Sequence, residues 1–201
     1  MNRTILVTGG SGVIGFSIVK YFYERDYNVV IAGLSNKKRI NKIKEEIDSD
    51  RSIIFNTELT KASNLKKIVQ ATVKKFKLID VLVNCAGIQF VSPIEKYPEK
   101  IWRKMMDINL TSPFLMTKAV LPIMRKNKFG RIINIASTHG LIASVNKSAY
   151  TASKHGLVGF TKVVALETAQ ENILEQMELQ IPAVLEKAWG RTDNPNRGKT
   201  R

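Results

Sequence analysis

Residues 4–15, TILVTGGSGVIG, decide the fold that this sequence predicts. The first four of them form a short β-branched run that indicates a buried strand, and apolar residues at helical spacing begin at Val13. Between strand and helix, glycines let the backbone approach a pyrophosphate, and the first free N–H groups of the helix point at it. A strand, a glycine-rich turn and a helix N-terminus in this order predict a dinucleotide site.

Along the rest of the chain, short β-branched runs alternate with longer amphipathic segments. This alternation predicts an α/β fold, a Rossmann-like doubly wound parallel sheet with helices on both faces. The predicted strands are residues 3–7, 28–33, 52–56, 79–84 and 130–136, and the predicted helices are about 13–26, 36–49, 61–76, 99–127 and 148–170. Ligands of such sheets bind beyond the carboxyl ends of the strands, so we expect the glycine turn, residues 84–87 and Ser137 to converge there.

A second motif, Tyr150-Thr151-Ala152-Ser153-Lys154, follows Ser137 by thirteen residues. Residues four apart share one face of a helix, so Lys154 can hold its ammonium near the Tyr150 ring. A nearby cation favours the phenolate and lowers the pKa of a tyrosine, which suits proton exchange at neutral pH. An acid–base phenol, a cation and a hydroxyl partner together predict carbonyl–alcohol redox chemistry.

Composition agrees with one compact domain. The 201 residues are 44% hydrophobic, enough to bury a substantial core. The single cysteine, Cys85, excludes an intrachain disulfide and suits a reducing cytosol. The start of the chain has no apolar stretch of signal-peptide length, and no window approaches a membrane span. We therefore expect a cytoplasmic protein with no membrane partner and no metal.

The formal net charge of +15 raises nucleic-acid binding as an alternative. The lysine runs at residues 37–39, 66–67 and 74–75 lie in predicted helices that also carry core-facing apolar residues. No aromatic residues interleave them as stacking platforms for bases. We expect solvated helix faces and no specific nucleic-acid partner.

The glycine turn, Asn84-Cys85-Ala86-Gly87, Asn109, Ser137 and the Tyr150/Lys154 pair, in this order, resemble the short-chain dehydrogenase/reductase family. Residues 84–93 and 130–166 are similar to the bacterial D-3-hydroxybutyrate dehydrogenases within it, and the resemblance extends from residue 1 to about 171. It implies reversible hydride transfer between NAD and a small anionic hydroxy or keto acid.

The resemblance also implies roles for individual residues. The implied catalytic residues are Asn109, Ser137, Tyr150 and Lys154. The implied cofactor contacts are Gly9, Ser11, Gly12, Ile14, Gly15, Leu34, Leu59, Asn84, Ala86, Gly87, Tyr150 and Lys154. The implied substrate contacts are Gln89, Ser137, His139, Lys147 and Tyr150, with Gln89, His139 and Lys147 on the carboxylate. Without the resemblance, His139 is interpreted as a residue that stabilises its loop and Lys147 as a solvent-exposed loop lysine. Asn109 is then interpreted as a residue that stabilises a helix kinked near Pro113.

Within the first 172 residues, three features depart from the family pattern. The glycine spacing TGxxGxxG belongs to its extended branch, and Cys85 stands where a second asparagine is usual. The end of the second predicted strand, Ala32-Gly33-Leu34-Ser35, has no acidic residue for a ribose 2′-hydroxyl, whereas residues 37–39 are basic and can meet a 2′-phosphate. We expect NAD, with NADP as the second choice.

The largest departure follows residue 172. We divide the chain into residues 1–172, an incomplete dinucleotide-binding domain, and 173–201, a divergent tail. Residues 173–188 read as helix broken at Pro182, and the last eight residues as a disordered basic segment. The family's C-terminal strands and substrate lid are expected to be missing, a frame-shifted gene being one hypothesis. Members of the family form homo-oligomers, but we do not predict a homo-oligomer for this chain. A working dehydrogenase therefore competes with an inactive cofactor-binding remnant, and a basic nucleic-acid-binding protein is a distant third.

Overall fold

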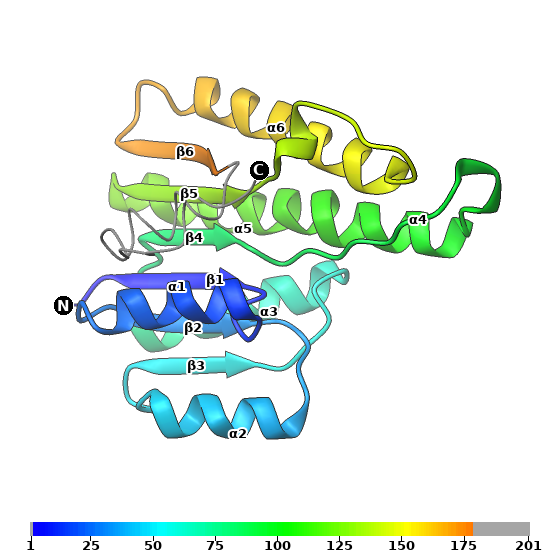
Figure 1. The fold of residues 1–201 in the computed structure, drawn as a ribbon. Coiled ribbons are helices and arrows are strands. Elements are labelled where there is room, and N and C mark those ends of the chain that lie inside the picture. Colours follow the sequence, from blue (N-terminus) through cyan, green and yellow to red (C-terminus); the bar gives the residue numbers. More distant parts are fainter. Residues whose placement is uncertain (1, 179–201) are drawn as a thin grey trace, which may run out of the picture.

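The computed structural model describes residues 2–178, which form one parallel six-stranded sheet with helices on both faces (Figure 1). The strands are β1 (Thr4–Thr8), β2 (Asn28–Ala32), β3 (Ser52–Phe55), β4 (Val81–Asn84), β5 (Gly130–Ile135) and β6 (Ile173–Glu178). The α-helices are α1 (Val13–Tyr23), α2 (Lys37–Glu46), α3 (Ala62–Phe76), α4 (Glu99–Met106), α5 (Ser112–Asn127) and α6 (Ser148–Glu167). Three short turns are η1 (Ile94–Lys96), the π-helical η2 (Asp107–Thr111) and η3 (Thr138–Gly140). The predicted α/β fold class is confirmed.

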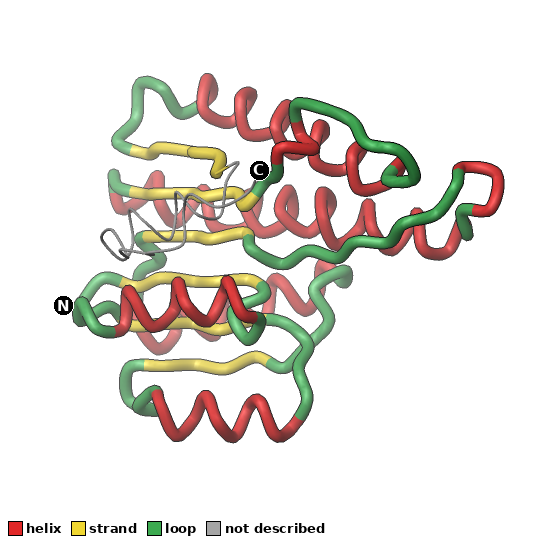
Figure 2. Tube along the Cα trace, in the orientation of Figure 1, coloured by secondary structure: helices red, strands yellow, loops and turns green. Residues whose placement is uncertain are grey.

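The sheet is covered on both sides, which explains its continuous apolar strands. All residues of β1 and β4 are buried, as expected where helices cover both faces. One apolar cluster packs residues of α1 and α2, such as Val19 and Ile43, against the sheet. A second packs residues of α3 and α5, such as Ile68 and Val120. Figure 2 shows α1 in front of the strands, α5 behind them and α2 beyond the edge formed by β3.

The strand order is β3-β2-β1-β4-β5-β6. β1 pairs with β2 on one side and with β4 on the other, so that Thr8 lies level with Ala32 and with Asn84. The chain therefore progresses in one direction from β1 to β3 and in the other from β4 to β6. A crevice opens where the order reverses, beyond the carboxyl ends of β1 and β4.

The interpretation of residues 173–188 as broken helix is wrong for its first six residues. Ile173–Glu178 form β6, which pairs in parallel with β5 from Gly130 opposite Ile173 to Ile135 opposite Glu178. The free edge of β5 offers backbone donors and acceptors that an extended segment satisfies, and this tertiary pairing outweighs local propensity. The sixth strand, expected to be missing, is present. The predicted tail from residue 179 on, including Pro182, lies outside the described residues.

The helix predicted over residues 99–127 is also corrected. It consists of α4, the π-helical η2 and α5, in succession. A π turn holds one residue more than an α turn and usually marks a functional position. No helix within residues 2–178 is long and apolar enough to cross a membrane.

Candidate active site

The glycine turn between β1 and α1 packs directly against the end of β4. Gly9 adopts a positive φ of 66°, and a Cβ there would lie 2.8 Å from the Cα of Ala86. A Cβ on Gly15 would overlap the Gly9 carbonyl oxygen and lie 2.8 Å from the Cα of Gly10. The N-cap of α1, Gly12, carries no side chain to bond the first helical N–H groups. These donors remain available to an anion such as a pyrophosphate.

A cleft of about 520 Å³ lies over this turn, a volume typical of cofactor sites. Nine residues predicted to contact a cofactor line it: Gly9, Ser11, Gly12, Ile14, Gly15, Leu34, Leu59, Ala86 and Gly87. Asn84 does not line it, because its amide turns into the sheet and donates to Asn134 Oδ1 at 2.8 Å. The chain therefore builds the cleft from segments that follow four strands, β1, β2, β3 and β4.

One basic residue near the cleft is fixed against the glycine turn. Arg39, on α2, donates through Nε to the Ser11 carbonyl at 2.9 Å, and its guanidinium lies 4.5 Å from the centre of the Phe16 ring. Lys37 and Lys38, its neighbours in the basic run, are exposed. Of the three residues considered for a 2′-phosphate, Arg39 is therefore the one held beside the dinucleotide turn.

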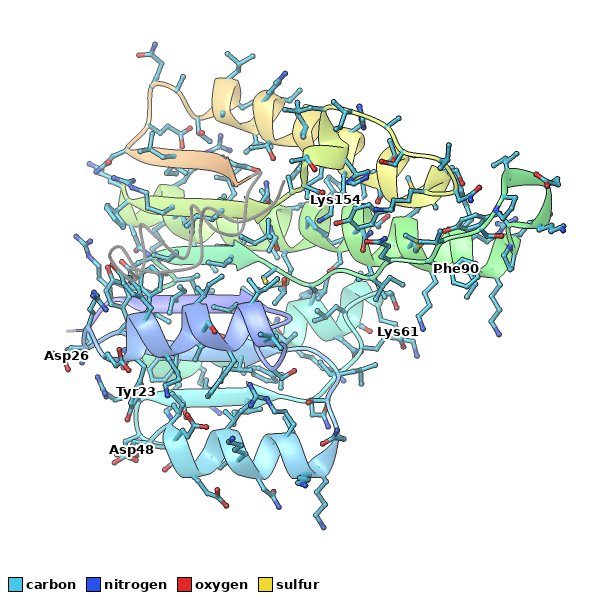
Figure 3. All side chains as sticks on the ribbon, in the orientation of Figure 1. Tyr23, Asp26, Asp48, Lys61, Phe90 and Lys154 are labelled. Atoms are coloured by element: carbon cyan, nitrogen blue, oxygen red, sulfur yellow. The ribbon has the colours of Figure 1, made fainter. Side chains whose placement is uncertain are left out.

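Tyr150 and Lys154 lie one turn apart on α6. Lys154 is 5% exposed, its Nζ donates to the Ile135 carbonyl at 2.6 Å, and the same atom lies 5.8 Å from the centre of the Tyr150 ring. Burial lowers the pKa of Lys154 to about 8. Figure 3 places Lys154 beneath α6 at the carboxyl end of β5. A Cβ on Gly87 would come within 3.9 Å of its Nζ, so the ammonium borders the cleft wall.

Ser137 and His139 lie at η3, directly after β5, and Lys147 lies just before α6. Ser137 Oγ accepts from the backbone N–H of His139 at 3.2 Å and lies 3.4 Å from its Nδ1. The other ring nitrogen, Nε2, lies 2.9 Å from Ser144 Oγ and 3.4 Å from Lys147 Nζ. The His139 and Tyr150 rings meet edge to face, with centres 5.7 Å apart. A phenol, two hydroxyls, an imidazole and an ammonium thus share one site.

Comparison with known proteins agrees with this geometry. Residues 3–182 match the family model described as short chain dehydrogenase. D-beta-hydroxybutyrate dehydrogenase of Cupriavidus necator is 42% identical over 172 residues, covering 85% of this chain and 67% of that protein.

The chain belongs to the short-chain dehydrogenase family.

Two further relatives of this short-chain dehydrogenase show the same extent of match. D-beta-hydroxybutyrate dehydrogenase of Rhizobium meliloti is 38% identical over 176 residues, covering 86% of this chain and 68% of that protein. The solved structure of a short-chain dehydrogenase from Streptomyces avermitilis superposes with a TM-score of 0.83 at 25% identity, covering 88% of this chain and 64% of that one. The chain thus spans about two thirds of the length of these relatives. The predicted family is confirmed.

Asn109 occupies the π turn of this short-chain dehydrogenase and is fully buried. Its Oδ1 accepts from the Ile88 N–H and its Nδ2 donates to the Ile88 carbonyl, both at 2.9 Å. The same Nδ2 donates to Ser153 Oγ at 3.2 Å. These contacts join η2, the loop after β4 and α6, so Asn109 holds the loop that carries Gly87.

Gln89 is the member of the predicted substrate set that the structure does not bring into contact with the others. It is exposed on the loop after β4, and its neighbour Phe90 lies out along that loop in Figure 3. The Ser92 N–H donates to the Asn146 carbonyl at 2.9 Å, which joins this loop to the one that carries Lys147. The two loops therefore lie side by side.

The sequence alone missed two groups of residues. Glu58, Thr60, Lys104 and Ile108 line the cleft but come from segments without a recognisable motif. Buried polar residues also cross the sheet: Asn134 Nδ2 donates to Glu175 Oε1 at 2.7 Å and to Thr161 Oγ1 at 2.8 Å. Burial, offset in part by the Asn134 hydrogen bond, raises the pKa of Glu175 to about 7. Asn134 is a polar residue inside a β-branched run. That pattern could have indicated the network that it forms with Glu175 and Thr161.

Cys85 is the cysteine that lines the cleft. It stands between Asn84 and Ala86, and its backbone N–H donates to Thr8 Oγ1 at 3.1 Å. Burial raises the pKa of its thiol to about 11, against the opposing effect of the Lys154 charge. The thiol therefore stays protonated at neutral pH and serves as a small cleft-lining group.

Proposed function

We propose that this short-chain dehydrogenase interconverts D-3-hydroxybutyrate and acetoacetate with NAD as cofactor. The observation that carries the proposal is the cluster of Ser137, His139, Lys147 and Tyr150 beside Lys154 and next to the dinucleotide cleft. A small hydroxy acid needs an acid–base group at its hydroxyl and donors at its carboxylate, and this cluster offers both. The similarity to two D-beta-hydroxybutyrate dehydrogenases supports the same substrate.

The residues present fit a nicotinamide dinucleotide. The uncapped N-terminus of α1 and the glycine turn suit its pyrophosphate, and Leu34 and Leu59 offer apolar surface in the cleft. When bound, the cofactor accepts hydride from the hydroxyl-bearing carbon or returns it. NADP is the second choice, because Arg39 lies beside the turn and no acidic residue follows β2.

The chain's own groups handle the proton and the developing charge. Tyr150 takes the hydroxyl proton as the carbonyl forms and returns it in the reverse direction. Ser137 donates a hydrogen bond to the same substrate oxygen and stabilises its charge. Lys154 holds its ammonium beside the phenol and would bind the cofactor ribose. Asn109 would keep the loop that carries Gly87 in place beside it. Lys147 supplies positive charge for the carboxylate, with His139 beside it and Gln89 on the adjoining loop.

We propose that the hydrogen bond between Asn84 and Asn134 shapes the carboxyl ends of β4 and β5. Asn84 contributes to the cofactor site through the backbone that leads to Ala86 and Gly87. We place the enzyme in the cytoplasm and propose no specific nucleic-acid or membrane partner, since its basic residues are scattered over helix faces.

Absorbance of NADH during incubation with acetoacetate tests the proposal on the purified 201-residue chain. We expect oxidation of NADH that depends on acetoacetate, and slower oxidation of NADPH. Tyr150→Phe is the matched control, since it removes a single oxygen. NADH binding without turnover on any small keto acid would instead favour a cofactor-binding protein, and salt-dependent DNA binding would favour the basic-protein alternative.

A further inference from the structure

The outer strands of the sheet, β5 and β6, carry their helices on one face. α5 packs on β5 and α6 packs on β6, on the face where Thr161 of α6 meets Asn134 and where Asn134 meets Glu175. On the opposite face the main contacts of α1 are with β1 and β2. Figure 1 shows α1 in front of β1 and β2, and no described α-helix in front of β5 or β6.

The face of β5 and β6 that carries Arg131, Ile133 and Leu174 is here called the open face. Leu174 pairs with Arg131, and alternate residues of a strand share one face, so these three side chains lie together. Leu174 is 47% exposed and Ile133 is half-buried. On the other face of the same strands, Ile132 and Ile173 are fully buried beneath the helices. The open face therefore leaves apolar surface that an amphipathic helix would cover.

The sequence that follows β6 has the pattern of such a helix. Residues 181–189, which lie outside the described residues, are IPAVLEKAW. Glu186 and Lys187 fall on one side of a helix drawn with this sequence, and the apolar residues form a stripe about 140° wide on the other side. The stripe has the i, i+3, i+4, i+7, i+8 spacing: Ile181, Val184, Leu185, Ala188 and Trp189. Pro182 in the first turn and Gly190 just past the end are typical start and stop signals.

We propose that residues 181–189 dock as a helix on the open face. β6 ends at Glu178, which pairs with Ile135 at the carboxyl edge of the sheet. Residues 179–180 then form the connection, a length usual between a strand and a helix of an α/β fold. Nine helical residues span about 14 Å, and a strand of six residues, such as β6, spans about 20 Å. The helix therefore fits on the face when it runs back toward the amino edge.

The short connection favours this segment over a second copy of the chain as the occupant. A partner tethered through a few residues has an effective concentration in the millimolar range, above that of a purified protein in an assay. A helix of this length is marginal in water and needs a surface to pack on. α6 already packs on the other face of β6, so a helix that follows β6 has the open face available.

Crosslinking of the 201-residue chain measures whether the segment lies on the open face. Cys85→Ala removes the one cysteine of the sequence, and Leu174→Cys places a thiol on the open face. Ala188→Cys adds a second thiol within the apolar stripe, and Lys187→Cys is the matched control on the polar side. With a short bismaleimide reagent, we expect the 174/188 pair to crosslink within one chain at least about tenfold faster than the 174/187 pair.

The other crosslinking outcomes would overturn the proposal. Equal rates for the two pairs, or no crosslink in either, would show that the apolar stripe does not face Leu174. A crosslink that joins two chains, seen as a dimer after denaturation, would identify a second copy as the occupant of the open face.

Trp189 gives a measurement that needs no new thiol. The sequence has two tryptophans, so Trp102→Phe leaves Trp189 as the single emitter. We expect acrylamide to quench Trp189 about threefold less in the folded chain than in urea, because docking buries the indole. Leu174→Glu should remove most of this protection, since docking would bury its charge. Leu166→Glu, on α6, is the matched control, because Leu166 is 78% exposed.

Circular dichroism checks that each variant is folded. Full quenching of Trp189 in the folded parent chain would refute docking. Protection that survives Leu174→Glu would show that the segment packs elsewhere, and the open face would then not be its site.

Discussion

The two halves of the sheet bury different kinds of side chain. In β1, β2 and β3 the buried residues are apolar or carry a hydroxyl, as at Thr4 and Ser52. In β4, β5, β6 and α6 the buried residues include two amides, a carboxyl and an ammonium: Asn84, Asn134, Glu175 and Lys154. The first half can hold a dinucleotide by backbone shape. The second half must place polar side chains, whose burial opposes stability unless each finds a partner.

The largest effect is expected in the second half, at the phenol. Tyr150→Phe removes the oxygen that exchanges the substrate proton, so kcat should fall by about a hundredfold to ten-thousandfold. Stopped-flow and steady-state rates measure this loss. The dissociation constant for NADH should stay within about twofold, because the turn and cleft are unchanged. A rate within about tenfold of the parent would remove Tyr150 from its assigned role.

In the first half, the variant with the largest expected effect acts by a steric clash. Gly15→Ala would press its Cβ into the Gly9 carbonyl and toward Gly10, so we expect about 1–3 kcal/mol of destabilisation and at least about tenfold weaker NADH binding. Gly159→Ala, on α6, is the matched control, since nothing lies within 4 Å of the new Cβ. It should gain up to about 1 kcal/mol from helix propensity. Equal NADH affinity in both variants would make the glycine turn structural only.

Lys154→Met tests whether the buried polar groups of the second half lower stability. It should change stability and activity in opposite directions. Removal of the buried ammonium should raise the free energy of unfolding by about 1–2 kcal/mol at neutral pH while turnover is lost and NADH binds more weakly. The lowered pKa of Lys154, about 8 against an ordinary 10.5, means that the folded chain binds fewer protons than the unfolded chain between these values. Wild-type stability should therefore rise with pH across that window, and the Met variant should lack this rise.

The smallest effect is expected at Glu175. Its pKa is raised from 4.5 to about 7, so the folded chain binds more protons than the unfolded chain between these values. Wild-type stability should fall as pH rises through that window. Glu175→Gln should remove this fall and be about 1 kcal/mol more stable than wild type at about pH 8. Denaturant unfolding at about pH 5 and about pH 8 measures it, and a wild-type stability unaffected by pH would contradict the buried position of the carboxyl.

The difference between the halves also explains what the sequence could predict. The first half follows local rules: an apolar strand, glycines at a turn and an amphipathic helix, all visible within residues 4–15. The strands β1 to β5 were predicted for that reason, and so was the glycine turn that lines the cleft. β6 was not, because Glu175 and its polar neighbours do not form a strand pattern, and only pairing with β5 makes that segment extended.

The candidate site shows the same limit. Tyr150, Lys154 and Ser137 are separated by short, fixed spacings, so the sequence indicated that they meet. Lys104 comes from a helix without a motif, and its place in the cleft depends on how α4 packs. The resemblance implied a cofactor contact for Asn84, yet its amide donates to Asn134, fifty positions further along. Contacts of that separation depend on strand order, which one sequence does not display.

The π turn at Asp107–Thr111 makes this enzyme sensitive to chain length in a way that substitutions would not reveal. Deletion of one residue there would restore an uninterrupted α-helix, and α4 and α5 would rotate against each other by about 100°, the angle between successive helical residues. The Asn109 side chain would then lose both hydrogen bonds to the Ile88 backbone, although both residues would still be present in the sequence. Over evolutionary time, insertions and deletions in this segment should thus be purged more strictly than changes of residue type.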